Sequence, residues 1–205
     1  MKLIFDIQTF WLCGTGQSAL GSADQTVNRT DGGLPFIPGK TIKGIVKHAL
    51  KEWTSLIGED ETADLSERLF GGQPDELAGQ KMDQSRGPIK GALRMGSAHL
   101  GVAETTFLTV KKNRSLIKGL YQNVASTEID HATGSAAHHS LRTMEVVVPL
   151  RLEAEVSWIE DAKYRHDLPQ NWQGILMESL SLIHNIGSNR SRGFGRCVVT
   201  MEGEK

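Results

Sequence analysis

Alternating apolar and polar positions predict two long strands in this chain. Residues 2–12 alternate at the start, with Leu3, Phe5 and Ile7 on one side. Residues 145–158 alternate more clearly, and a period of two places their apolar side chains on one face of a sheet. Pro149 falls on the other face of that strand, where its missing N–H predicts an edge or a bulge.

Two stretches repeat with the period of a helix. The first follows Gly39 and ends near Gly58, and its apolar positions form one face: Ile42, Ile45, Val46, Ala49, Leu50 and Trp53. The second covers about 170–186 and is expected to end at Gly187, after burying Trp172, Leu176, Leu180 and Ile183.

The order of these elements predicts an α+β fold. Weaker patterns add a strand around Ile89–Leu100, a short strand or turn within 104–120, and a final strand at Cys197–Met201. Strand, helix, strands, long strand, helix, strand fits a ferredoxin-like βαββαβ core, in which the first and last strands are neighbours and both helices cover one face. We expect one domain over residues 1–205, with exposed insertions at about 59–88 and 121–144.

The composition indicates a globular protein but does not indicate its function. The 205 residues are 39% apolar and 23% charged, as in ordinary globular proteins, and the net charge is −1. A nucleic-acid site would therefore need a local cluster of basic residues. Two cysteines, the lack of a signal-peptide pattern and the lack of any apolar run of about 18 residues predict a soluble cytoplasmic protein without membrane contact.

Lysines form a second row along the first helix. They are Lys40, Lys43, Lys47 and Lys51. Such a row after a glycine-led helix start can hold phosphates, or it can be a solvated face. The Gly39-Lys40-Thr41 triplet is not a P-loop, because Leu34 stands where that motif needs glycine and two prolines remove backbone donors.

A glycine-flanked basic loop precedes the last strand, at Ser188–Arg196. It contains three arginines around Phe194. Arginine forks bind phosphates and a phenylalanine can stack on a base. The same loop could be a helix-to-strand turn with solvated arginines and Phe194 in the core, and the sequence leaves both interpretations open.

Other candidate chemistry is weaker. His131, His138 and His139 lack the spacing of a zinc site. Asp24 and Asp31, in the polar loop before the first helix, could hold a hard cation or accept a proton, or they could be turn residues.

Three motifs resemble the RAMP superfamily of CRISPR–Cas proteins, in particular the repeated backbone subunit of type III effector complexes. The first is Leu-Pro-Phe-Ile-Pro-Gly-Lys-Thr-Ile-Lys-Gly at 34–44. The second is Leu-Phe-Gly-Gly at 69–72, and the third is the glycine-rich segment 187–196. They follow the family's order and span most of the chain.

The resemblance implies an RRM-like core with an inserted β-hairpin thumb near 128–143. It also implies partners: guide RNA (crRNA), target RNA, further copies of the chain and other CRISPR–Cas subunits. Lys43 matches a guide-contacting lysine. Asp24 matches an aspartate that cuts target RNA with a divalent metal, Mg²⁺ or Mn²⁺, and Arg29 ends the same short pattern. Thr26 departs from it, standing where the family has proline or a small apolar residue.

These interpretations define a predicted site. Asp24 is its catalytic and metal-binding residue. The RNA-binding residues are Arg29, Lys40, Lys43, Lys47, Arg190, Arg192, Gly193, Phe194 and Gly195. The leading hypothesis is a guide-RNA-binding backbone subunit that cleaves target RNA at regular intervals. The alternatives are a non-catalytic capping or scaffold subunit, and a metal-independent guide-processing endoribonuclease that uses His48 or another histidine.

Overall fold

A four-stranded antiparallel sheet forms the centre of the protein. The computed structural model describes residues 1–14, 25–58, 62, 64–72, 90–162 and 164–203. In the order in which they pair, the strands are β2 (Leu93–Met95), β5 (Arg151–Trp158), β1 (Lys2–Ile7) and β6 (Cys197–Glu202). The first and last strands are neighbours, paired from Lys2 with Glu202 to Ile7 with Cys197, as the sequence predicted.

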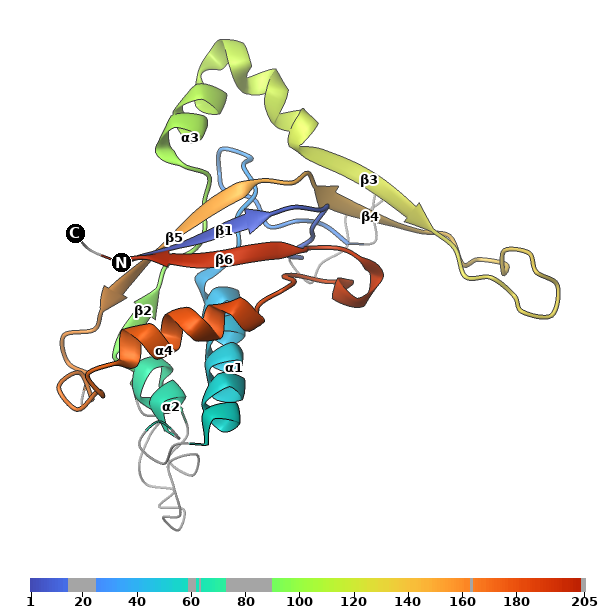
Figure 1. Ribbon diagram of the computed structural model, residues 1–205. Helices are drawn as coiled ribbons and strands as arrows, with labels where there is room; N and C mark the ends of the chain where they lie inside the picture. Colours follow the sequence, from blue (N-terminus) through green and yellow to red (C-terminus); the bar gives the residue numbers. More distant parts are fainter. Residues whose placement is uncertain (15–24, 59–61, 63, 73–89, 163, 204–205) are drawn as a thin grey trace, which may run out of the picture.

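Helices cover one face of this sheet (Figure 1). They are α1 (Gly39–Ile57), α2 (Leu65–Phe70), α4 (Trp172–Ser179) and the short 3₁₀ helix η4 (Leu180–Leu182). Phe5 and Leu152 of the sheet are fully buried, together with Ile42 and Leu50 of α1 and Leu176 of α4. The predicted α+β class is confirmed, and both predicted helices have the expected apolar faces.

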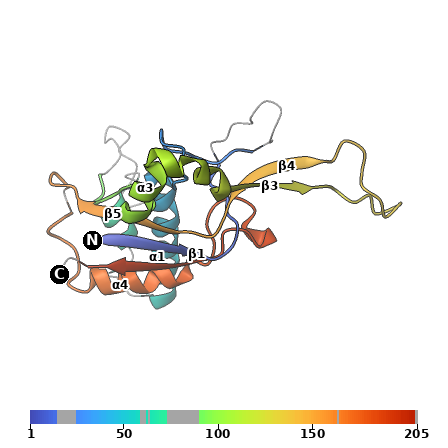
Figure 2. The same cartoon turned by 90° about the horizontal axis from the view of Figure 1, so that it is seen from above.

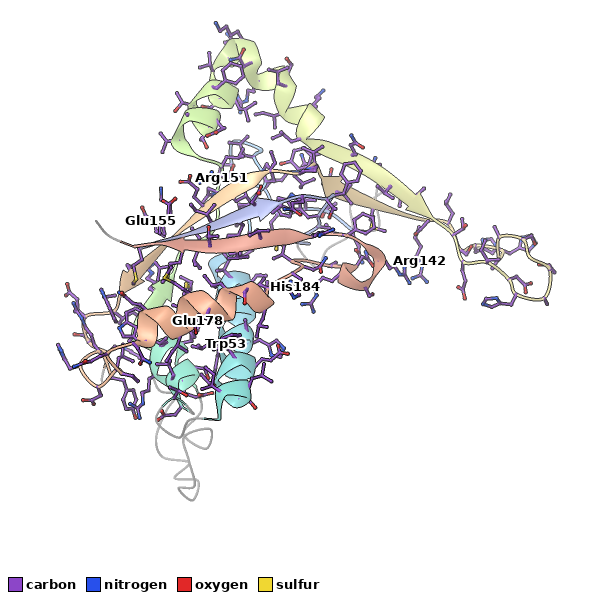
Figure 3. All side chains as sticks on the ribbon, in the orientation of Figure 1. Trp53, Arg142, Arg151, Glu155, Glu178 and His184 are labelled. Atoms are coloured by element: carbon purple, nitrogen blue, oxygen red, sulfur yellow. The ribbon has the colours of Figure 1, made fainter. Side chains whose placement is uncertain are left out.

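The opposite face of the sheet is polar. Arg151, Glu153 and Glu155 alternate with buried residues of β5, and Lys2 lies 2.8 Å from Glu153. Figure 3 shows Arg151 and Glu155 on the side away from the helices. Glu202 of β6 adds another carboxylate, so acidic groups predominate there.

The long strand expected at 145–158 is two strands in two different sheets. β4 (Arg142–Val147) pairs with β3 (Tyr121–Ser126) in a hairpin that projects from the body (Figure 2). The chain leaves this hairpin at Val148 and enters the central sheet at Arg151. Pro149 lies at the break, where it cannot donate a ladder hydrogen bond. An unbroken alternation therefore concealed a change of sheet.

Several other expectations need correction. Residues 104–120 are not a strand or turn but helix α3 (Val102–Thr109) followed by the 3₁₀ helix η3 (Lys111–Leu120). The first strand ends at Ile7 rather than at residue 12. The strand expected over 89–100 is reduced to β2, with isolated bridges at Ala98 and His99.

The two expected insertions differ from each other. The one at 121–144 contains β3 and the start of β4, so it is the projecting hairpin itself. Within the one at 59–88, the described residues include α2, whose Leu65, Leu69 and Phe70 are fully buried. That part belongs to the core, because three large apolar side chains pack beneath the sheet there.

Candidate nucleic-acid interface

The glycine-rich loop lies beside the first half of α1. Between them is a groove of about 610 Å³, lined on the α1 side by Gly44, Ile45 and His48. His184 and Arg190 line the other wall. Two of the sequence motifs, far apart along the chain, therefore share one surface.

A second hollow of about 300 Å³ extends this groove toward the start of α1. Ile45 and Arg190 line both hollows, which makes them continuous. Thr41 and Ser188 are added at this end. The combined surface is long and open, a shape suited to an extended ligand rather than a small enclosed one.

Backbone hydrogen bonds hold the glycine-rich loop rigidly in place. The N–H of Ser188 donates to the carbonyl of Leu12, and the N–H of Gly195 donates to that of Phe10, both at 2.8 Å. Gly195 has a φ of +70°, and a Cβ there would collide with the carbonyl of Ile186. Gly195 is thus required by the loop's own folding, and the loop is pre-organised before any ligand arrives.

The remaining predicted loop residues differ in exposure. Arg190 and Arg192, at the two ends of the 3₁₀ helix η5 (Arg190–Arg192), are exposed, as is Gly193. Phe194 is half-buried against the hydrophobic core, and its carbonyl accepts a hydrogen bond from Asn185 Nδ2 at 3.1 Å. This placement favours the interpretation of Phe194 as a packing residue over that of a base-stacking one.

The four lysines of the row on α1 fall into two groups, which have different surroundings. Lys40 and Lys43 are exposed. Lys47 Nζ instead donates to the carbonyl of Gly71 at 2.9 Å and lies 3.8 Å from Glu67 Oε1. Lys51 is also within 3.6 Å of that carboxylate, which is almost fully buried in α2. The second half of the row therefore compensates a buried charge, and the first half remains available for phosphates.

Arg29 joins the segment before α1 to the projecting hairpin. Its Nη2 lies 2.5 Å from Glu145 Oε1, and its guanidinium carbon lies 3.7 Å from the centre of the Tyr121 ring. The Tyr121 hydroxyl donates to the carbonyl of Gly33 at 2.6 Å. Burial raises the pKa of Tyr121 to about 12, with Arg29 opposing the rise and Glu145 adding to it. Arg29 was predicted to bind RNA, yet its charge is already matched by Glu145.

Asp24, the predicted catalytic and metal-binding residue, lies outside the described residues. Its neighbour Gln25 is described, and Gln25 forms a bridge with Met144 of the hairpin. Within the described part of the chain, no group of three or more His, Cys, Asp or Glu side chains could hold a metal ion. Asp31 is exposed.

Two residues of this surface were not predicted. His184 comes from the end of the second helical segment, and Arg142 from the start of β4. Figure 3 labels both, with Arg142 on the hairpin side of the loop that carries η5. No sequence motif marks either one, since each gains its place only when distant segments fold together.

The comparisons with known proteins agree with this geometry. The family model described as the RAMP superfamily matches residues 5–198. This chain belongs to the RAMP superfamily. The resemblance of its three motifs is thereby confirmed.

Solved structures show the same fold. One is described as the type III-B Cmr-beta cryo-EM structure of the apo state, with a TM-score of 0.60. Another is type III-B Cmr-beta bound to cognate target RNA, with a TM-score of 0.63. Each is 10% identical, over 97% of this chain and 95% of the other.

A comparison with curated proteins yields no match. Of the helices that the structure describes, none has the length and apolar character needed to span a membrane.

Proposed function

We propose that this chain is an RNA-binding subunit of a type III CRISPR–Cas effector complex, of the Cmr kind. The observation that carries the proposal is the position of Arg190, which faces α1 across both hollows of the groove. Lys40 and Lys43 are exposed on that helix. RAMP membership supports the proposal, as does the likeness to a Cmr-beta structure that contains target RNA.

Charge favours the groove over the open face of the sheet. RNA carries one negative charge per nucleotide, and its affinity for proteins depends largely on lysine and arginine contacts with phosphates. The open sheet face presents Glu153, Glu155 and Glu202, which repel phosphates. Exposed basic groups are found instead on α1, on the glycine-rich loop and, as a further cluster, on η3, so a net charge of −1 is compatible with local RNA binding.

The test is RNA binding by the purified chain. Lys43→Glu is expected to weaken the affinity for single-stranded RNA and to lower the slope of log K against log salt. Arg151→Glu makes the same charge change on the open face of the sheet (Figure 3) and is the matched control. Equal effects of the two variants, or no effect of Lys43→Glu, would contradict the groove.

The chain is further proposed to contact other subunits, including copies of itself. Helices α3 and η3 stand away from the body and expose Val102, Phe107 and Leu116. The tip of the hairpin exposes Ile129 and Leu141. Apolar side chains that project in this way are typical of surfaces that partners cover.

Target-RNA cleavage through Asp24 is the finer proposal. Its support is the match of Asp24 and Arg29 to the catalytic pattern of the family. The described residues provide no cluster able to hold Mg²⁺ or Mn²⁺. Asp24→Ala should leave RNA binding intact and abolish cleavage of target RNA by the assembled complex. Unchanged cleavage would assign the chain to the non-catalytic alternative.

One observation favours a second candidate function. His48 and His184 line the same groove from opposite walls, and a pair of histidines can act as general base and general acid on a ribose phosphate. That arrangement would suit a guide-processing endoribonuclease without a metal. Cleavage of repeat RNA that persists in EDTA and is lost in both His48→Ala and His184→Ala would support it.

A further inference from the structure

A small hollow separates the glycine-rich loop from the end of the β3–β4 ladder that is farther from the central sheet. Its volume is about 90 Å³. Arg142, the first residue of β4, lines it from one side, and Arg192, the last residue of η5, lines it from the other. Figure 3 shows Arg142 beside the loop that carries η5.

The charges of these two arginines are not compensated within the described part of the chain. No described carboxylate lies within 4.0 Å of either guanidinium. Arg29, in the segment before α1, differs because Glu145 of the hairpin pairs with it. Two uncompensated guanidinium groups around one hollow repel each other, and an anion between them removes that repulsion.

The rest of the lining combines polar side chains with the apolar side chain of Met144. Ser126 contributes a hydroxyl group and Asn189 a side-chain amide. Asn189 has a φ of +57°, and its Nδ2 lies 3.4 Å from the sulfur of Met144, which also lines the hollow. This contact links the loop to the hairpin, so the two arginines keep a defined spacing.

The volume of the hollow indicates the kind of anion that it can hold. Pockets for whole small molecules usually measure about 300–1,000 Å³, which is far larger than this hollow. A single phosphate group suits the available space and offers oxygens to two arginine forks.

We propose that Arg142 and Arg192 together clamp one backbone phosphate of the bound RNA at the end of the β3–β4 ladder that is farther from the central sheet. The inference rests on the proposed function, because it takes the ligand to be RNA. Arg190 and Arg192 line hollows on different sides of η5. An RNA strand that leaves the α1 groove and crosses η5 therefore reaches the clamp next. Phosphate contacts position a strand and do not read its bases.

The experiment measures binding of a fluorescent, mixed-sequence single-stranded RNA to the purified full chain over a series of salt concentrations. Arg142→Ala and Arg192→Ala are each expected to weaken binding about tenfold and to lower the salt slope by about 1. The double variant should weaken it by less than the product of the single effects, because either loss opens the same clamp. The affinity of Arg142→Lys should lie between those of the wild type and Arg142→Ala, since lysine keeps the charge but not the forked guanidinium group.

Three controls separate the possible outcomes. Arg151→Ala removes an exposed arginine from the open face of the sheet and should change neither affinity nor slope. Arg142→Ala should weaken the binding of single-stranded DNA of the same sequence by the same factor as the binding of RNA, because the clamp contacts no sugar. Melting temperatures of all variants show whether each one is folded.

Different failures have different meanings. If Arg142→Ala binds like the wild type while Lys43→Glu and Arg190→Ala bind weakly, the clamp is wrong and the proposed function stands. If the effects of Arg142→Ala and Arg192→Ala multiply fully, the two arginines bind separate phosphates and the shared clamp is wrong. If none of these variants changes RNA binding, the proposed function fails as well.

Discussion

Arg29 and Glu145 join two segments that are far apart in sequence, with 2.5 Å between Nη2 and Oε1. Glu145 Oε2 also accepts the backbone N–H of Val27 at 3.3 Å, and Tyr121 packs under the guanidinium at 3.7 Å. The contact fixes the segment before α1 against the hairpin. A residue that matches a motif of an RNA-binding family thus has a structural role here.

Arg29→Ala is expected to lower the free energy of unfolding by about 1–2 kcal/mol, combining a half-exposed ion pair with a cation–π contact. Urea denaturation measures this. Arg151→Ala is the control, since its guanidinium is more exposed and lies 4.0 Å from Glu202. An Arg29→Ala protein of unchanged stability and weakened RNA binding would restore the RNA-contact interpretation.

Lys43→Ala and Lys47→Ala are expected to have different effects, the first on RNA affinity and the second on stability. Lys43→Ala removes an exposed charge and should reduce RNA affinity with little change in stability. Lys47→Ala removes the hydrogen bond to Gly71 and one of two cations near the buried Glu67, so it should cost about 1–3 kcal/mol of stability. The measurements are thermal unfolding and RNA binding on both variants, and the opposite assignment of the two losses would contradict the division of the lysine row.

Gly195→Ala and Gly193→Ala should differ although both residues have positive φ. A Cβ on Gly193 meets nothing within 4 Å, so only the backbone conformation is strained, by about 1–2 kcal/mol. A Cβ on Gly195 also collides with the Ile186 carbonyl, and the loop must move. We expect a clearly larger fall in melting temperature for Gly195→Ala, together with weaker RNA binding. Equal losses would show that the loop has room to shift.

Because the two cysteines are buried, we expect the protein to lose stability at high pH. Burial raises the pKa of Cys13 to about 12, with a further contribution from Cys197, and burial raises that of Cys197 to about 11. Unfolded thiols ionise near their ordinary pKa of 9.0, whereas the folded ones stay neutral. The stabilisation is therefore complete below pH 9 and is lost as the pH rises from about 9 toward 12.

Urea denaturation at pH 7 and at about pH 10 tests this prediction. Cys13→Ala should show a smaller pH dependence than the wild type, even if it is less stable at both values. Thiol reagents should label the native protein slowly and the unfolded protein fully, because buried thiols with raised pKa values react poorly. Rapid labelling of the native chain would contradict the burial of these groups.

Phe107→Ser tests the exposed patch on α3. The side chain is 56% exposed and helix α3 has no buried residue, so the isolated chain should keep its melting temperature within about 2 °C, as for most surface substitutions. Assembly with the other subunits should weaken, as measured by size-exclusion chromatography of the reconstituted complex. Val198→Ser, at an exposed position of β6 (49%), is the control.

Much of the fold could be predicted from local pattern. The apolar face of α1, the stop at Gly58 and the buried face of α4 depend on residues three and four positions apart, so periodicity reveals them. The three family motifs and their order were sufficient for the superfamily. What periodicity could not show was where an alternating run changes sheets, because β4 and β5 have the same pattern on both sides of Pro149.

The candidate site could also be predicted only in part from the sequence. Composition and motifs selected the lysines of α1 and the arginines of the glycine-rich loop as candidates for binding phosphates. Only the tertiary structure showed that two of the predicted cations, Lys47 and Arg29, already pair with carboxylates, because Glu67 and Glu145 come from distant elements. The hollow between Arg142 and Arg192 has the same origin, because it exists only where the start of β4 lies beside η5, and neither segment alone encodes it.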